Sequence, residues 1–153
     1  MLVIGVGNRL RGDDGASGKV VQRLRERGPQ TRVSVSEQLY EPTDLLEAWR
    51  GGDAVVLVDT MRSGEPPGTI RRFDVSSAPL PARLRGSGST HAFGLHEAIE
   101  LGRALDRLPR RLIVFAVEGR QFEVGAALSG EVAAAVAPLA DAVLEEASEL
   151  AKL

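Results

Sequence analysis

Short apolar runs recur along the chain, and each predicts a β-strand. The runs 2–6, 54–58 and 112–117 are apolar throughout or nearly so, apart from Gly5 in the first. Such uniform runs are typical of parallel strands that are covered on both faces. Alternating apolar positions over 31–38 predict another strand. Residues 69–75 predict a short strand that is antiparallel or lies at a sheet edge.

Helical periodicity fills the intervals between these strands. We expect a helix that carries Val20, Val21 and Leu24, one from about Pro42 to Trp49, one from about Leu95 to Leu105, and one that Ser129 caps and that runs to about Leu150. Strands alternating with helices predict an α/β fold. We therefore expect a single domain over 1–153, a three-layer α/β/α sandwich with a mostly parallel five-stranded twisted sheet.

Composition narrows the classes of function. The net charge of −2 gives no basic surface for nucleic acid. The chain has no cysteine, which excludes disulfides, a thiolate nucleophile and a cysteine-based zinc site, so a metal site would need His and carboxylates. No apolar run approaches the ~20 residues of a membrane span, and no secretory signal is recognisable, so we expect a cytoplasmic protein without membrane contact.

The first strand leads into a glycine-rich turn and two adjacent acids, Asp13 and Asp14. In doubly wound folds the ligand site lies at the carboxyl ends of the strands, where this turn would be. The turn resembles the dinucleotide motif G-x-G-x-x-G, but Leu10 stands at the third glycine, and two carboxylates would repel a phosphate. A nucleotide-binding enzyme is therefore a disfavoured alternative. We expect one acid to be the helix N-cap and the other to be available for chemistry.

Asp59 follows the apolar run 54–58, so we expect it at the same edge of the sheet. In a flavodoxin-like strand order the first and third strands are neighbours. Asp14 and Asp59 would then face each other across the crevice at that edge. The alternative for Asp59 is a local role in a turn or cap. Glu118, after 112–117, is expected at this edge as well.

The chain has two histidines, His91 and His96. His91 is expected where a long irregular loop, 76–88, meets the next helix. His96 lies five residues on, about half a turn out of phase on a helix, so we expect the two rings to point differently. With Asp14 and Asp59, His91 makes a carboxylate–carboxylate–imidazole set. Such a set suits a divalent transition metal with open positions, and zinc, nickel and cobalt all fit it.

Several of these segments, taken in chain order, resemble the hydrogenase maturation proteases. They are Gly5-Val-Gly-Asn-Arg-Leu-Arg-Gly-Asp-Asp-Gly15, Val58-Asp59, Pro67-Gly-Thr69, Ser89-Thr-His91 and Leu128-Ser-Gly-Glu-Val132. The members of this family are endopeptidases that remove a C-terminal extension from the large subunit of [NiFe] hydrogenases. The resemblance covers nearly the whole chain.

The resemblance implies that Asp14, Asp59 and His91 gather at one cleft and recognise nickel already bound in the precursor. These three would be both the metal ligands and the catalytic residues. The nickel would be carried by the substrate, and cleavage would follow only after its insertion. The implied partner is the precursor of a large subunit, and a monomer is the favoured state. A carboxylate could activate water, or the metal could polarise the scissile carbonyl.

The chain also departs from the family pattern. Many members carry Asp-Gly-Gly-Thr at the end of the second strand, a stretch tied to substrate recognition, where this chain has Glu-Gln-Leu-Tyr at 37–40. Ala92 and Ser17 stand where many members have glycine. No implied ligand is lost. The departures keep open an alternative of a different class, a non-proteolytic metal-binding or docking protein on the same fold.

Overall fold

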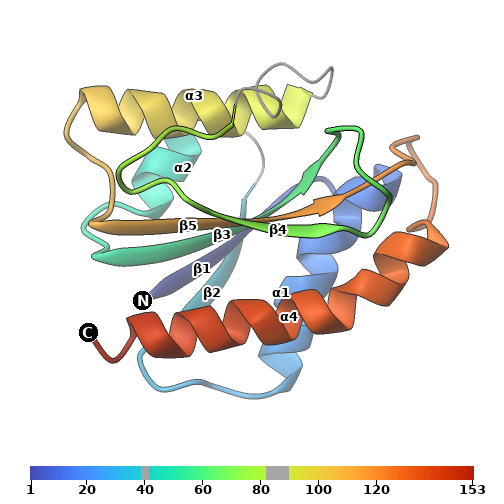
Figure 1. The fold of residues 1–153 in the computed structure, drawn as a ribbon. Helices are drawn as coiled ribbons and strands as arrows, with labels where there is room; N and C mark the ends of the chain where they lie inside the picture. Colours follow the sequence, from blue (N-terminus) through green and yellow to red (C-terminus); the bar gives the residue numbers. More distant parts are fainter. Residues whose placement is uncertain (39–41, 82–89) are drawn as a thin grey trace.

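A five-stranded sheet forms the centre of the computed structural model, which describes residues 1–38, 42–81 and 90–153 (Figure 1). The strands are β1 (Leu2–Val6), β2 (Ser34–Gln38), β3 (Ala54–Met61), β4 (Ile70–Asp74) and β5 (Arg111–Glu118). The helices are η1 (Gly12–Gly15), α1 (Ala16–Glu26), α2 (Pro42–Ala48), α3 (Thr90–Ala104) and α4 (Gly130–Leu150). The strand order is β2-β1-β3-β5-β4, and only β4 pairs antiparallel among these strands.

Helices cover both faces of the sheet, with α1 and α4 on one side and α2 and α3 on the other (Figure 1). Successive residues of β3 alternate between two apolar clusters, because side chains of a strand point to opposite faces. Val56 and Val58 pack toward α1 and α4, whereas Val55 and Leu57 pack toward α2 and α3. The predicted α/β/α architecture, with β1 beside β3, is confirmed.

Two strand boundaries differ from the sequence prediction by more than one residue. The second strand begins at Ser34 rather than near 31, because Arg32 has a positive φ of 65° in a tight turn that pairs Gln30 with Val33. The third strand continues past the apolar run to Met61, so Asp59 lies inside β3 and pairs with Ala116. The strand continues there because β5 runs equally far and supplies partners for these last residues.

Helix α3 begins at Thr90, about five residues before the predicted start. The apolar stripe from Leu95 marked the expected start, and Gly94 is a poor helix former. The helical backbone nevertheless runs through Gly94 and starts at Thr90. His91 therefore lies in the first turn of α3 rather than before the helix. Of the predicted loop 76–88, residues 82–88 lie outside the described residues, as do Leu39 and Tyr40 of the unusual segment 37–40.

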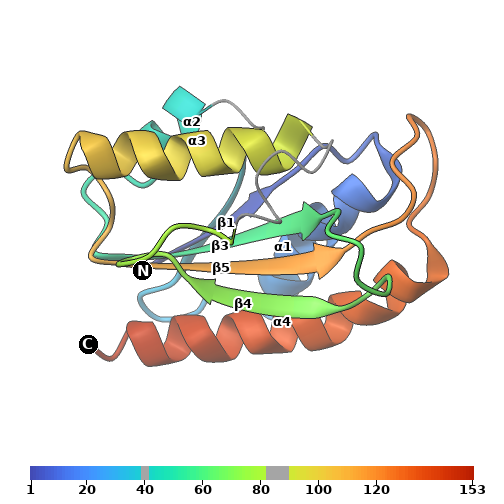
Figure 2. The same cartoon turned by 45° about the horizontal axis from the view of Figure 1, so that its top comes forward.

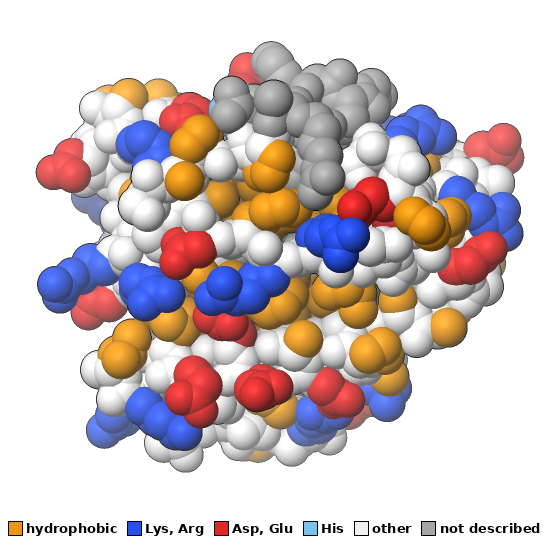
Figure 3. Space-filling model, viewed as in Figure 1, with side chains coloured by type: hydrophobic (Ala, Val, Ile, Leu, Met, Phe, Trp, Pro, Cys, Tyr) orange, Lys and Arg blue, Asp and Glu red, His pale blue; other side chains and the backbone are white. Residues whose placement is uncertain are grey.

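Ion pairs cover the antiparallel edge strand. Arg71 and Arg72 of β4 pair with Glu65 at 2.8 Å and Glu146 at 2.9 Å. Basic and acidic side chains are interspersed on this face of the molecule in Figure 3. Charged outward residues discourage pairing with a further strand. Among the helices that the structure describes, none combines the length and apolarity needed to cross a membrane.

Candidate functional site

Parallel strands β1, β3 and β5 end at one edge of the sheet, and the loops that follow them gather there (Figure 2). Four carboxylates at this edge are almost completely buried. They are Asp13, Asp14, Asp59 and Glu118, with exposed fractions of 0%, 1%, 3% and 2%. A buried carboxylate is costly unless hydrogen-bond donors surround it. The donors around each carboxylate therefore indicate what that acid does.

Asp14 lies in η1, the single 3-10 turn between the opening loop and α1. The backbone N–H of Asn8 donates to its Oδ2 at 2.8 Å, so the carboxylate reaches back to the end of β1. The prediction that one of the two acids caps the helix is wrong. The N-cap of α1 is Gly15, because the extra 3-10 turn separates both acids from the first residue of the helix.

Asp13 binds the distant loop between β5 and α4. Its Oδ2 accepts the N–H groups of Arg120 at 2.8 Å and Gln121 at 2.9 Å, and its Oδ1 accepts the N–H of Ser129 at 2.7 Å. The Ser129 hydroxyl, 3.0 and 2.9 Å from the two oxygens, donates as well. Ser129 holds the predicted N-cap position of α4, but its hydroxyl contacts Asp13 rather than the helix. Burial alone would raise the pKa of Asp13, but these donors outweigh it and hold the pKa below its ordinary value.

Asp59 projects from β3 toward the side of the sheet that α3 covers. The N–H of Thr60 donates to its Oδ1 at 2.7 Å. Asp59 lines a small cavity of about 20 Å³ together with apolar residues that include Leu80 and Leu95. Leu95 belongs to α3, so the helix that carries His91 lies over Asp59.

The first turn of α3 lies at the edge where β3 and β5 end (Figure 2). Position 91 is four residues before Leu95, so it falls on nearly the same face of the helix, one turn closer to that edge. The side chain of His91 lies outside the described residues. Among the described side chains, no three His, Asp or Glu residues are placed to hold a metal ion. The set of Asp14, Asp59 and His91 therefore stays a prediction.

His96 is at a different angle on α3, about 140° around the helix from position 91. Its side chain is partly exposed, and its buried Nδ1 has no hydrogen-bond partner within the described part of the chain. Two charged residues farther along α3 contact each other rather than His96: Arg103 forms an ion pair with Glu100. Arg103 also donates hydrogen bonds to backbone oxygens within 75–78.

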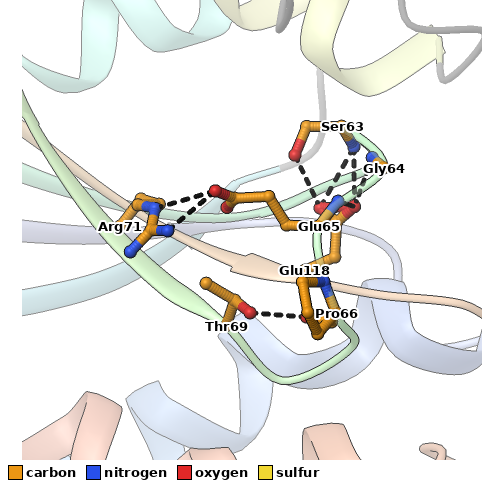
Figure 4. A network of polar contacts seen from close by, with 7 residues as sticks. All are labelled: Ser63, Gly64, Glu65, Pro66, Thr69, Arg71 and Glu118. Carbon is orange, nitrogen blue, oxygen red and sulfur yellow. Dashed lines mark hydrogen bonds and ion pairs between the residues drawn. The ribbon is translucent and has the colours of Figure 1, made fainter.

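Glu118 fixes the loop that follows β3 (Figure 4). Its Oε1 accepts the N–H groups of Ser63 and Gly64, both at 2.8 Å, and of Glu65 at 3.1 Å. The Ser63 hydroxyl donates to Oε2 at 3.0 Å. All of these donors belong to one loop, so we assign Glu118 a structural role at this edge.

A family model described as hydrogenase maturation protease (HycI) matches residues 19–146, which is most of the chain. The chain belongs to the hydrogenase maturation protease family. The predicted resemblance is confirmed, and the prediction of a peptidase is confirmed at the level of the family. The matched range includes Asp59 and His91, whereas Asp14 precedes it.

Proteins named for the formation or maturation of hydrogenases align over nearly all of this chain. The hydrogenase expression/formation protein HupD of Thiocapsa roseopersicina is 26% identical over 149 residues, which are 95% of this chain and 66% of HupD. The hydrogenase maturating endopeptidase HybD from E. coli is 25% identical, covers 97% of this chain and 91% of its own, and superposes with a TM-score of 0.82. HybD from Thermococcus kodakarensis is 25% identical to this chain, and the match covers 95% of this chain and 97% of HybD. The two structures superpose with a TM-score of 0.73.

The opening turn of this family member does not offer a phosphate site. A pyrophosphate would need unoccupied backbone N–H groups there. The N–H groups of Asn8, Leu10, Arg11, Asp13 and Asp14 all have acceptors within the protein. The acceptors include the Asp14 carboxylate and the Asn8 side chain. The nucleotide-binding alternative therefore has no support in the geometry of the turn.

Sequence patterns located Asp14 and Asp59 at this edge but did not separate the roles of the two adjacent acids. The partners of Asp13 lie 107 to 116 residues away in the chain, at Arg120, Gln121 and Ser129. No periodicity or short motif links such distant positions. Thr60 was missed for the same reason, although its hydroxyl donates to the backbone oxygen of Asp13 at 3.1 Å.

Proposed function

We propose that this chain is an endopeptidase that removes a C-terminal extension from the precursor of a [NiFe] hydrogenase large subunit after nickel insertion. One observation carries the proposal. In a member of the maturation protease family, two carboxylates, Asp14 and Asp59, are buried at the carboxyl ends of the adjacent strands β1 and β3. Ligand sites of doubly wound folds form at this place in the sheet.

Asp14, Asp59 and His91 have the chemistry to recognise nickel that the precursor carries. Carboxylates and an imidazole are suitable ligands for a divalent transition metal that has open positions. In this proposal the nickel belongs to the substrate, and its other ligands come from the precursor. The absence of cysteine from this chain fits such a division, because the protein brings no thiolate of its own.

The position of α3 supports the inclusion of His91. Leu95 contacts the same cavity as Asp59, and residue 91 is one helical turn earlier on nearly the same face. That turn lies at the edge of the sheet where Asp14 and Asp59 are buried (Figure 2). The backbone position of residue 91 is therefore consistent with its inclusion in the proposed set.

Bond cleavage can follow either of two routes from this arrangement. A carboxylate of Asp14 or Asp59 that is not bound to metal can take a proton from water as it attacks the peptide carbonyl. Alternatively, the nickel of the substrate would polarise that carbonyl for attack by water, whose proton passes to the leaving amine, and the protein residues would only orient the metal. In either route we expect cleavage to require recognition of the bound nickel, so that cleavage would report nickel insertion.

The decisive experiment is cleavage of a nickel-loaded precursor by the purified protein, with the products weighed by mass spectrometry. We expect a mass loss that matches a C-terminal extension. The loss should be absent with nickel-free precursor and with Asp14→Ala, Asp59→Ala or His91→Ala. Asp44→Asn, at an exposed acid of α2, is the matched control and should cleave like the wild type.

An intact precursor with nickel shown to be in place would contradict the proposal. Retained binding of the precursor in that case would favour the docking alternative. Glu37 would then be the first residue to examine, because it begins the unusual segment 37–40 and its carboxylate pairs with Arg9 of the opening turn at 2.7 Å.

A further inference from the structure

Thr60 contacts both segments that carry the candidate acids. It is 2% exposed and follows Asp59 in β3. Its backbone N–H donates to Oδ1 of Asp59 at 2.7 Å. Its hydroxyl donates to the backbone oxygen of Asp13 at 3.1 Å. A single residue thus holds the carboxylate of one acid and the backbone beside the other.

The backbone oxygen of Asp13 is part of the peptide group that joins Asp13 to Asp14. A peptide group is planar, so a hydrogen bond to this oxygen also restricts the orientation of the Asp14 backbone. The N–H of the same peptide group donates to the Arg11 oxygen at 3.0 Å. Both polar atoms of the peptide group are therefore fixed, one of them by Thr60.

Gly119 restricts the rotamer of Thr60. A Cβ atom at position 119 would lie 2.9 Å from Cγ2 of Thr60 and 3.0 Å from Cβ of Asp13. The Gly119 backbone therefore packs directly against the methyl group of Thr60. A β-branched side chain has few accessible rotamers, and this contact favours the one that turns the hydroxyl toward Asp13.

Asp13 is held in place independently of Thr60, because its carboxylate accepts hydrogen bonds from the backbone of Arg120, Gln121 and Ser129. The N–H of Asp13 also donates to the Gln121 oxygen at 2.6 Å. The hydroxyl of Thr60 therefore connects β3 to a rigid point rather than to a loop that could adjust.

We propose that Thr60 is a positioning residue that sets the relative placement of Asp14 and Asp59 through its hydroxyl. It does not contact the metal or the peptide in this assignment. The inference rests on the proposed function, in which these two acids meet the nickel of the precursor. Small displacements of catalytic groups reduce rates strongly, so the hydroxyl should matter for turnover more than for folding.

The test compares Thr60→Val with Thr60→Ser. Valine keeps the N–H, the branching and the volume but removes the hydroxyl, whereas serine keeps the hydroxyl and loses the methyl group. With nickel-loaded precursor, we expect Thr60→Val to lower kcat roughly tenfold or more with a smaller change in KM. Thr60→Ser should recover most of the rate. Thermal melting of both variants checks that each is folded, and Thr60→Ala replaces Thr60→Val if that variant does not fold.

Wild-type rates in Thr60→Val would overturn the inference, and so would equal losses in Thr60→Val and Thr60→Ser, which would assign the effect to packing. Failure of the wild type to cleave would instead count against the proposed function. In that case crystal structures of wild type and Thr60→Val still test Thr60. An unchanged distance between the carboxylates of Asp14 and Asp59 would overturn its positioning role, and a changed distance would support it.

Discussion

Asp13 and Asp14 are adjacent in the chain and equally buried, yet their surroundings differ. The carboxylate of Asp13 accepts hydrogen bonds from three residues of a loop more than 100 positions away. The carboxylate of Asp14 accepts the N–H of Asn8, only six residues away, at the end of β1. The first acid joins two distant parts of the chain, and the second remains at the strand ends where a ligand would bind. Burial and sequence spacing alone do not separate the structural acid from the one that we propose to act on a ligand.

The largest effect that we expect is on turnover in Asp14→Asn. The amide oxygen of asparagine can still accept the N–H of Asn8, so the fold should be kept. Loss of a ligand or general base should lower the rate of precursor cleavage on the order of a hundredfold or more. Cleavage rates and thermal melting of the same preparation check this. If Asp14→Asn were less stable than the wild type but cleaved at the normal rate per folded molecule, Asp14 would be a structural acid like Asp13.

Asp13→Asn should show the opposite behaviour. Backbone N–H groups of Arg120, Gln121 and Ser129 point at the two carboxylate oxygens of Asp13, with at least one at each oxygen. In the asparagine variant, the side-chain NH₂ group would therefore face an N–H group in either orientation. We expect a loss of about 2–3 kcal/mol in the free energy of unfolding, since buried donors lose their acceptor. Urea denaturation measures this loss. A stability equal to that of the wild type would show that the loop does not depend on Asp13.

The same acid should make stability depend on pH. The pKa of Asp13 in the folded protein is lowered by its donors, so its contribution is complete above the unfolded value of about 3.9 and is lost as pH falls through the folded pKa. Glu131 and Arg120, which pair with each other nearby, also titrate or carry charge there. The stability difference between wild type and Asp13→Asn should therefore stay constant from about pH 6 to about pH 4 and shrink as the pH falls further toward about 2. Urea midpoints across this range check it, and a constant difference would contradict it.

The smallest effect should come from His96→Gln. Among the residues that the structure describes, none is a hydrogen-bond partner of the His96 Nδ1, and His96 is about 140° around α3 from His91. We expect cleavage close to wild type and a change in unfolding free energy of about 0.5 kcal/mol or less. His91→Gln, measured beside it, should lose most of the activity. Equal losses in the two variants would show that the angular argument is wrong.

The sequence was sufficient for the strands that are apolar on both faces. β1 and β5 were predicted almost to their ends, because a continuous apolar run permits little else. The start of α3 was missed, since Gly94 weakens the local helical signal while the folded helix continues through it. The antiparallel direction of β4 was left open by the sequence and is decided by its pairing with β5.

Two acids of the candidate site could be placed from the sequence because each comes after an apolar run that predicts a strand. Asp14 and Asp59 were expected at one edge of the sheet because parallel strands end at a common edge. The role of Asp13 could not be found, because it depends on Ser129 and other residues brought close only by the complete fold. The same holds for Thr60, whose hydroxyl contacts Asp13 across 47 positions.

Gly119 has a consequence for how this family member can change in evolution. Its missing side chain leaves room for Thr60, Asp13 and the ring of Phe122, whose Cζ would lie 2.7 Å from an added Cβ. An added methyl group at 119 would press on the strand β3, the turn η1 and the loop after β5 at the same time. We therefore expect glycine at this position to be under a stronger constraint than the residues that surround it.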